Sequence, residues 1–290
     1  MALTPRWVGL VYLAVAAALF GGMYVVSRWA LTAVPLLALM WLRDATALGV
    51  LGAYGLATHR RFTLTRSQLG RAAAIGIVGL GLSGAAQLWG TAVTSAAWAS
   101  VATAAAPAFM ILSARRAPAS SLTRRWLGLG CAGVGIAVLL WAPAFRWGVV
   151  VLVASALGWA LSSAWASGIA RREQVFGITW GALVVVTLVL APIAAIAWHP
   201  SDTRWSWGLV WAVLYLGGGS TAAALLLWHR GVMLAGTAAG AMAFFAQPLV
   251  GLALGAWTLG EATPPALLLG AVLLFLASWW LGSRPPWAYR

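Results

Sequence analysis

Long apolar segments, separated by short polar breaks, follow one another along almost the whole chain of 290 residues. Most offer about 18 or more largely apolar positions, the length that a helix needs to cross a bilayer. The segments are continuously apolar and do not alternate with period two, so the pattern excludes an outer-membrane barrel. It predicts an all-α membrane protein with ten transmembrane helices, at 7–28, 36–57, 71–91, 96–114, 126–142, 148–170, 176–198, 206–228, 234–257 and 264–282.

Composition removes the main alternative class. Hydrophobic residues make up 63% of the chain and charged residues 8%, whereas a soluble protein carries about 25% charged residues. Ten helices of about 20 residues use about 200 positions, so the remainder forms loops and leaves no room for a soluble domain. The first segment is long enough to span, and no small-residue cleavage site follows it. We therefore expect a first span there and not a signal peptide.

The basic residues set the expected orientation. All 18 are Arg, and they fall mainly in the short breaks, where no basic domain exists to hold a nucleic acid despite the net charge of +14. Ten alternating spans put fourteen of them on one side, three (Arg28, Arg146 and Arg204) on the other, and Arg43 inside a span. Positive charge collects on the cytoplasmic side. We therefore expect both termini in the cytoplasm and a multi-pass protein of the inner membrane.

Two stretches of the chain resemble each other. Residues 101–140 read "VATAAAPAFMILSARRAPASSLTRRWLGLGCAGVGIAVLL", and residues 242–281 read "MAFFAQPLVGLALGAWTLGEATPPALLLGAVLLFLASWWL". Each has a Pro within a small-residue helix, then a loop, then Leu-Gly at the start of another helix. The predicted repeats are residues 1–145 and 146–290, and five spans per repeat, an odd number, invert the second copy. Inverted repeats are typical of secondary transporters, whose substrate site lies near the midplane at the repeat interface.

Four segments carry a family resemblance. They are "LFGGMYVVSRWAL" in span 1, "PLLALMWLRDATALG" in span 2, "AAAP" in span 4 and "AFFAQPLVGLALGAWTLGEATPPALLLGAVLL" over spans 9 and 10. Through them the chain resembles the EamA type of the drug/metabolite transporter superfamily. The first copy reads "SARRAPASS" where the second has Gly260 and Glu261, so any role of that acid is not duplicated.

The resemblance implies a fold and an activity. It implies two inverted five-helix repeats around a central cavity, which is lined mainly by helices 1, 3, 4, 6, 8 and 9. It also implies alternating access and export of small metabolites, commonly amino acids. It leaves open whether the chain stands nearer to the aromatic amino acid exporters of the superfamily.

Polar and aromatic residues inside the spans are candidates for contacting a substrate. Gln87 and Gln247 stand out, because a buried amide needs several hydrogen-bond partners. The candidate binding residues are Tyr24, Arg43, Gln87, Trp98, Trp159, Ser163, Trp165, Phe244 and Gln247. Other such positions within the spans are Phe20, Ser162, Tyr215, Ser220, Thr221 and Phe245. For the polar residues the competing interpretation is a hydrogen bond between helices, and for the aromatic residues it is packing or contact with lipid.

Four further residues are predicted hinge or gate positions. Gly21 and Gly22 permit a local break in span 1, with close helix approach as the competing interpretation. Pro107 and Pro248 each remove a backbone hydrogen bond within a span, and the competing interpretation is a tolerated kink.

Asp44 is the only acid expected within a span, so it is the candidate for any coupling to protons. Its neighbour Arg43 favours the ionised carboxylate and opposes proton uptake, which predicts a facilitator. Adjacent helical residues point about 100° apart, so the two need not touch. Arg43 either meets a substrate carboxylate or helix-end carbonyls, or it joins Asp44 in holding neighbouring helices together.

Other polar residues receive structural interpretations. We expect Glu261 to cap the helix that follows it, and His59, His199 and His229 to lie at the membrane interface. Cys131 has no partner for a disulfide or a metal site. We therefore expect no metal and no cofactor.

These observations predict a transporter and not an enzyme. The main hypothesis is a facilitative exporter of small metabolites, either amino acids or related zwitterions. An exporter of cationic drugs would want an acidic or aromatic cage, and the shortage of acids within the spans counts against it. A lipid enzyme would need clustered polar residues at an interface, and a scaffold subunit would leave the inverted repeat without a purpose. The expected partners are the lipid bilayer and a small-molecule substrate, and a monomer is the simplest oligomeric state.

Overall fold

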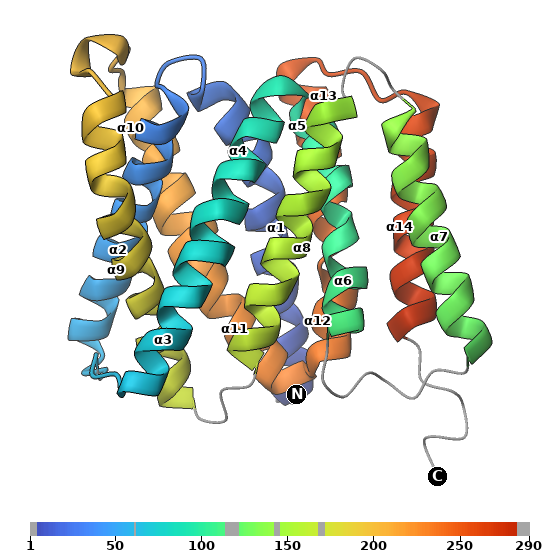
Figure 1. Ribbon diagram of the computed structural model, residues 1–290, viewed down its shortest axis with the longest axis horizontal. Helices are drawn as coiled ribbons and strands as arrows, with labels where there is room; N and C mark the ends of the chain where they lie inside the picture. Colours follow the sequence, from blue (N-terminus) through green and yellow to red (C-terminus); the bar gives the residue numbers. More distant parts are fainter. Residues whose placement is uncertain (1–4, 61, 114–121, 142–145, 168–171, 283–290) are drawn as a thin grey trace.

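The computed structural model describes residues 5–60, 62–113, 122–141, 146–167 and 172–282, and every regular element in these ranges is a helix. The helices run side by side, and their connections gather at the two ends of the bundle (Figure 1). Helix α1 begins with Pro5 at the bottom of Figure 1 and finishes with Ala30 near the top. We call these ends of the bundle the Pro5 end and the Ala30 end. The all-α prediction is confirmed for the described part of the chain.

The helices follow the predicted apolar segments closely. They are α1 (Pro5–Ala30), α2 (Leu36–Ala57), α3 (Arg66–Ala74), η1 (Ile75–Leu82), α4 (Ser83–Val93), α5 (Ala96–Ala102), η2 (Thr103–Ala105), α6 (Ala106–Ser113), α7 (Leu122–Leu140), α8 (Arg146–Ser167), α9 (Arg172–Ala197), η4 (Pro200–Asp202), α10 (Trp207–Leu214), η5 (Tyr215–Ala223), α11 (Ala224–Ala235), α12 (Thr237–Ala243), α13 (Ala246–Leu259) and α14 (Pro265–Gly282).

Seven helical segments within the described ranges are long and apolar enough to cross a membrane. They are Arg6–Ala30, Leu36–Ala57, Arg66–Val93, Leu122–Leu140, Arg146–Trp165, Phe176–Ala197 and Trp207–Ala235. Three shorter apolar segments, Ala96–Leu112, Ala246–Leu259 and Pro265–Leu281, lie at the positions of predicted spans 4, 9 and 10. The segment of span 9 is short because Phe244 and Phe245 separate α12 from α13 in a turn.

Each of two predicted spans is interrupted near a proline. A single 3-10 turn, Thr103–Ala105, separates α5 from α6, and Pro107 is the second residue of α6. Pro248 is the third residue of α13, directly after the turn at Phe244 and Phe245. The first turn of a helix has backbone N–H groups without helical partners, so a proline costs little there. Both prolines therefore mark a restart of the helix.

Two other segments contain wide, π-helical turns. η1 joins α3 to α4, and η5 joins α10 to α11. Both are rich in small residues, with the sequences IGIVGLGL and YLGGGSTAA. π-helical turns are rare and occur frequently at functional sites, and these two lie on opposite sides of the cavity described below.

The helices pack as a central group between two outer pairs. α7 packs against α14 at the right of Figure 1, and α2 packs against α9 at the left. Between them, α1 packs against α11 and α13, and α8 packs against α4 and α6. The approach of α1 to α13 is close: a Cβ atom at Gly21 would lie 2.6 Å from the backbone oxygen of Gln247. α1 continues through Gly21 and Gly22 without a break, so these glycines here provide close helix contact.

Candidate functional site

A small cavity lies in the central group, where the interrupted helices and the wide turns meet. Its volume is about 80 Å³, which leaves room for a few water molecules. Its wall is mainly apolar in area, and the polar residues in it are Tyr24, Arg43, Ser83, Gln87, Thr103, Ser155, Ser220, Thr221 and Gln247. The larger apolar residues around it are Phe20, Met23, Leu80, Trp159, Leu225 and Phe244. The cavity is thus buried, polar on part of its wall and aromatic on another.

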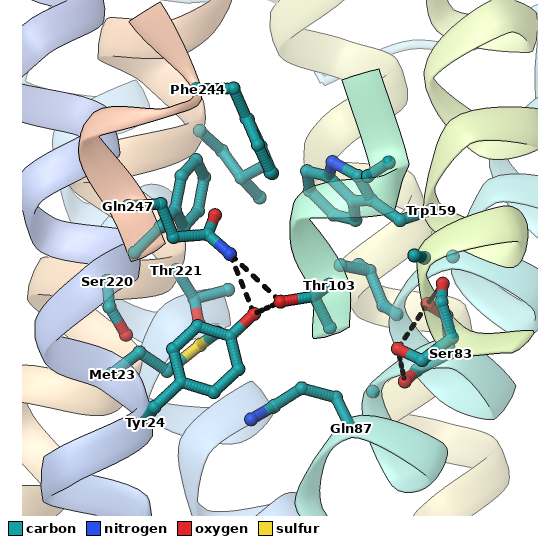
Figure 2. A pocket seen from close by; sticks show the side chains of 18 of the residues that line it. Met23, Tyr24, Ser83, Gln87, Thr103, Trp159, Ser220, Thr221, Phe244 and Gln247 are labelled. Atoms are coloured by element: carbon teal, nitrogen blue, oxygen red, sulfur yellow. Dashed lines mark hydrogen bonds between the residues drawn. The ribbon is translucent and has the colours of Figure 1, made fainter. Parts of the chain in front are cut away.

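Three side chains from three helices form a hydrogen-bonded triad in this cavity (Figure 2). The Tyr24 hydroxyl lies 2.6 Å from Thr103 Oγ1, which joins α1 to the interruption between α5 and α6. The Gln247 amide on α13 donates to the Tyr24 hydroxyl at 2.8 Å and to Thr103 Oγ1 at 3.2 Å. All three residues are buried. The triad therefore connects both interrupted helices to α1.

The bonds of the triad have a direction. The Thr103 hydroxyl donates to the Ala99 carbonyl oxygen at 2.8 Å, so it accepts from Tyr24. Gln247 in turn places its nitrogen toward both hydroxyl oxygens, and Figure 2 shows its oxygen turned away from them. This arrangement gives every hydroxyl proton an acceptor, as buried polar groups require. The amide oxygen of Gln247 remains as an acceptor beside the triad.

Aromatic rings gather on the Pro5 side of the triad. Phe20 lies one helical turn nearer to Pro5 than Tyr24 does. Its ring meets Trp159 at a centroid distance of 5.9 Å and Trp228 at 6.4 Å, both edge to face, and lies 6.2 Å from Phe244. Trp228 and Phe244 meet at 5.3 Å. Edge-to-face pairs each add about 0.5–1.5 kcal/mol beyond burial. We call Phe20, Trp159, Trp228 and Phe244 the aromatic cluster.

Two lining residues hold polar atoms without a partner. The Gln87 amide nitrogen donates to Thr91 Oγ1 at 3.1 Å, but its oxygen has no hydrogen-bond partner among the described residues. The indole N–H of Trp159 is likewise buried and unpartnered in the described part of the chain. Unpaired buried polar atoms are costly, and each calls for an explanation such as a ligand or water. Both residues line the cavity, so a bound molecule there could pair with them.

Ser83 and Ser155 form a second polar contact in the wall. Each hydroxyl donates to the backbone oxygen of the other residue, at 2.6 and 2.8 Å, and the two hydroxyl oxygens lie 3.2 Å apart. Because every bond is made between α4 and α8, this pair holds the two helices together and leaves few groups to bind a ligand.

Arg43 and Asp44 do touch, although they are neighbours on one helix. Arg43 Nε donates to Asp44 Oδ1 at 3.2 Å, and both side chains are buried. The guanidinium lies over Gly84 of α4, where a Cβ atom would come within 2.7 Å of Nη2. Asp44 Oδ1 is its one hydrogen-bond acceptor among the described residues, so its other N–H donors can serve a molecule in the cavity. Arg43 thus lines the cavity and also contacts Asp44.

The other predicted site residues lie in different places. The structure brings Tyr24, Arg43, Gln87, Trp159, Phe244 and Gln247 together around the cavity. Trp98 is buried in α5 but does not line it, and Ser163 on α8 also lies outside it. Trp165 on α8 is exposed.

The prediction for Glu261 was wrong about the helix that it caps. Its carboxylate accepts hydrogen bonds from the backbone N–H groups of Ala96 and Ala97, both at 2.8 Å. These groups open α5 in the first half of the chain, not α14. Gly260, with φ at +64°, turns the chain after α13, and Gly255 leaves space for the carboxylate. The first N–H groups of α5 have no helical partners and carry a partial positive charge, so they bind the carboxylate of Glu261. The first residue of α14 is a proline, which has no N–H group to offer.

A second bond across helices lies at the same end of the bundle. Arg28, in the last turn of α1, donates to the backbone oxygens of Thr91 and Ala92 near the end of α4. A cation suits the negative end of a helix, as an anion suits the positive end. With Glu261, this bond ties α1 to α4 and α13 to α5 at the Ala30 end.

Sequence reasoning did not select several residues of the site. Thr103, Ser83, Ser155 and Met23 line the cavity, and Thr103 is part of the triad. The one signal for Thr103 was its position four residues before Pro107, in a helix of small residues. Trp228 joins the aromatic cluster, and nothing in the sequence separates it from the other nineteen Trp residues.

Comparison with known proteins indicates a family of membrane transporters. Residues 146–283 match the EamA-like transporter family. Over 61 residues the chain is 44% identical to the permease-like protein YdzE of Bacillus subtilis (strain 168), a match that covers 21% of this chain and 78% of that relative. A solved structure, titled only as the crystal structure of a protein, has a TM-score of 0.62 at 21% identity and covers 95% of this chain and 97% of that one. This last likeness shows a shared fold.

Proposed function

Because the chain belongs to the EamA-like transporter family, whose members are membrane transporters of small compounds, we propose that it exports zwitterionic metabolites, amino acids above all. The observation that carries this proposal is the chemistry of the cavity. A buried guanidinium, an unpartnered amide oxygen and a cluster of aromatic rings surround one small space.

Each part of an amino acid finds a complementary group there. The free N–H donors of Arg43 suit a carboxylate, because guanidinium binds planar oxyanions with two parallel bonds. The amide oxygens of Gln87 and Gln247 suit an ammonium group, which is only a donor. The aromatic cluster suits an apolar or aromatic side chain and attracts cations to its ring faces. In this arrangement the triad orients Gln247.

The size of the cavity supports alternating access. At about 80 Å³ it is far smaller than ligand pockets, which usually measure about 300–1,000 Å³. Helices must therefore part to admit a substrate. The aromatic cluster forms the barrier on the Pro5 side, and the bonds of Arg28 and Glu261 hold the Ala30 end together. We propose the interruptions before Pro107 and Pro248 as the hinges between these two barriers.

We also propose the complete architecture of ten spans in two inverted repeats, residues 1–145 and 146–290. Seven long and three shorter apolar helical segments at the predicted positions support it. So does the correspondence between the halves, since spans 3 and 8 each contain a π-helical turn and spans 4 and 9 each break before a proline. The distribution of Arg supports cytoplasmic termini and an inner-membrane location.

Transport is proposed to be facilitative. The support is the bond from Arg43 Nε to Asp44 Oδ1, which engages the only acid that we place inside a span with a fixed positive charge. In liposomes, flux through the wild type and through Asp44→Asn should respond equally weakly to an imposed pH gradient. Strong uphill accumulation by the wild type that Asp44→Asn abolishes would refute this part of the proposal.

Flux through purified protein in liposomes tests the function itself. Vesicles loaded with one amino acid should take up a labelled amino acid in exchange, and aromatic and aliphatic zwitterions should compete better than organic cations. Gln87→Leu, which removes the unpartnered oxygen, should weaken competition by zwitterions, while Ser163→Ala outside the cavity should leave it unchanged. Protein-free vesicles give the background.

Two alternatives give different results in the same assay. A multidrug exporter would carry organic cations in preference to zwitterions, and a scaffold subunit would carry neither. The cavity favours the main proposal because its one charged group with donors to spare is a cation, Arg43. We expect full activity from a monomer, and dilution of the protein to one copy per vesicle tests this.

A further inference from the structure

A second and larger cavity, of about 300 Å³, lies at the Pro5 end between α1, α2, α9 and α11. Its polar lining consists of Tyr12, Tyr54, Arg60, His229 and Arg230. Its apolar lining consists of Phe176, Leu226, Met233 and Leu234. We call this space the basic pocket.

The basic pocket concentrates hydrogen-bond donors and positive charge. Arg230 Nη2 donates to the Tyr54 hydroxyl at 2.6 Å, which fixes the guanidinium of α11 against α2. Arg60 is placed by its backbone N–H, which donates to the Gly55 oxygen at 2.8 Å beyond the end of α2. Both guanidinium groups belong to half-buried residues. The described lining contains two cations and no carboxylate.

One ring nitrogen in this pocket is unpartnered. His229 Nδ1 is buried and has no hydrogen-bond partner among the described residues. A buried polar atom of this kind, in a space that two arginines and two tyrosines also line, points to a ligand that pairs with several of these groups at once. The ligand must be an anion rich in acceptor oxygens, since Arg has only donors to offer.

The basic pocket is distinct from the central cavity. The two share no lining residue. Along α1, Phe20 of the aromatic cluster separates Tyr12 from Tyr24, and along α11 Trp228 separates Arg230 from Leu225. The aromatic cluster therefore stands between the two spaces, and the basic pocket lies at the helix ends, beside α2 and α9.

We propose that the basic pocket binds the phosphate group of an anionic lipid from the leaflet at the Pro5 end. The guanidinium groups of Arg60 and Arg230 and the hydroxyls of Tyr12 and Tyr54 can donate hydrogen bonds to the oxygens of a phosphate ester. The basic pocket lies at the ends of the spanning helices, the depth of lipid headgroups, and most of the Arg residues that the structure describes lie at this end, as expected for a cytoplasmic face. The apolar lining, Leu226, Met233 and Leu234 of α11 with Phe176 of α9, fits the glycerol and upper chains of a lipid.

Native mass spectrometry of the purified full chain tests this proposal. The protein is titrated with phosphatidylglycerol, with diacylglycerol of the same chains, and with inorganic phosphate. Phosphatidylglycerol should form one tight adduct, with an affinity at least about tenfold above that of diacylglycerol, as expected for charge-assisted hydrogen bonds. Equal binding of the two lipids would overturn the proposal. Displacement of the lipid by equimolar inorganic phosphate would overturn the lipid as the ligand.

Variants locate the binding. Arg60→Gln with Arg230→Gln should reduce phosphatidylglycerol binding to the diacylglycerol level. Arg66→Gln, an exposed Arg at the start of α3 on the same end, is the matched control and should bind like the wild type. If the double variant does not fold, two single variants replace it, Arg60→Gln and Arg230→Lys. The lysine keeps the positive charge but cannot donate two parallel hydrogen bonds, and each variant should weaken binding about tenfold. Wild-type affinity in these variants, or an equal loss in Arg66→Gln, would contradict the proposal.

Discussion

The two interrupted helices are built alike but begin very differently. α5 begins at the Ala30 end, where Ser95 Oγ accepts from the N–H of Trp98 and Glu261 accepts from the next two residues after Ser95. α12 begins at the Pro5 end after Gly236, and no side chain of the described residues caps it. One helix start is therefore held by three side-chain hydrogen bonds, and its counterpart by none.

Under the alternating access proposed above, this difference predicts that the Pro5 end opens more easily than the Ala30 end. Opening the Ala30 end requires breaking charge-assisted bonds to Glu261 and Arg28, which are stronger than neutral ones. Opening the Pro5 end requires separating the rings of the aromatic cluster, which have no fixed hydrogen bonds between them. Two helices with similar interruptions thus differ at their starts through a few side chains.

The largest effect is expected where the two interrupted helices meet, at Gln247. Gln247→Leu removes both amide hydrogen bonds, to Tyr24 and to Thr103, and leaves their oxygens without that donor. We expect a loss of about 2–4 kcal/mol in stability and at least a tenfold loss of flux. Thermal unfolding and liposome exchange measure the two. Thr103→Ser, which keeps the hydroxyl, is the control and should retain most of both, whereas full flux in Gln247→Leu would show that the triad is not needed.

The next effect tests the capped helix start directly. Glu261→Ala leaves two N–H groups of α5 without their acceptor, a cost of about 1–3 kcal/mol. The Ala30 end should then open more often. In a Cys131→Ser background, a Gln87→Cys probe should react faster with a membrane-impermeant maleimide added at that end. Glu261→Gln retains an acceptor oxygen and should show a smaller increase; an unchanged rate in both would remove Glu261 from the gate.

A smaller effect is expected at the uncapped start. Gly236 has φ at +91° and ψ at 160°, a conformation that only glycine adopts readily. Gly236→Ala should therefore cost about 1–2 kcal/mol, although a Cβ atom there would meet nothing within 4 Å. Thermal unfolding measures the cost. Stability equal to the wild type would mean that the chain before α12 rearranges freely, which would strengthen the contrast with α5.

The smallest effect is expected at Gly260, before Glu261. Its φ of 64° and ψ of 24° lie in the left-handed helical region, which Asn also tolerates. Gly260→Asn should cost less than about 1 kcal/mol and leave maleimide labelling at position 87 unchanged. A large loss in this variant would indicate that the position of Glu261 is far more constrained than its two hydrogen bonds require.

The sequence predicted the helices better than their ends. Apolar length alone located the apolar helices, and the placement of Pro107 and Pro248 indicated two similar interruptions. Glu261 was assigned to the wrong helix because its partners, Ala96 and Ala97, are more than 160 positions away in the chain. Hydrophobic pattern records which residues are buried from water, but it carries no signal for which helix ends meet.

The candidate site was predicted only in part, because the sequence does not show which helix faces meet. Gln87 and Gln247 stood out as amides within spans, Tyr24 was selected among the aromatic residues, and all three line the cavity. Thr103 and Ser83 did not stand out in the sequence, because small hydroxyl residues are common in tightly packed helices and bond to their own backbone. Trp165 was selected as an aromatic residue in a predicted cavity helix, but a continuously apolar helix does not reveal which face meets lipid.

The π-helical turns in η1 and η5 give these two spans a tolerance that the others lack. Such a turn accommodates one residue more than the α-helix around it, and one residue corresponds to about 100° of rotation. The wide turn absorbs this rotation locally, so deleting one glycine from Gly217–Gly219 would return the segment to α-helix and leave Trp228 in the aromatic cluster. A single-codon deletion in either wide turn is therefore a change that the flanking helices tolerate without exchanging the residues that line the cavity.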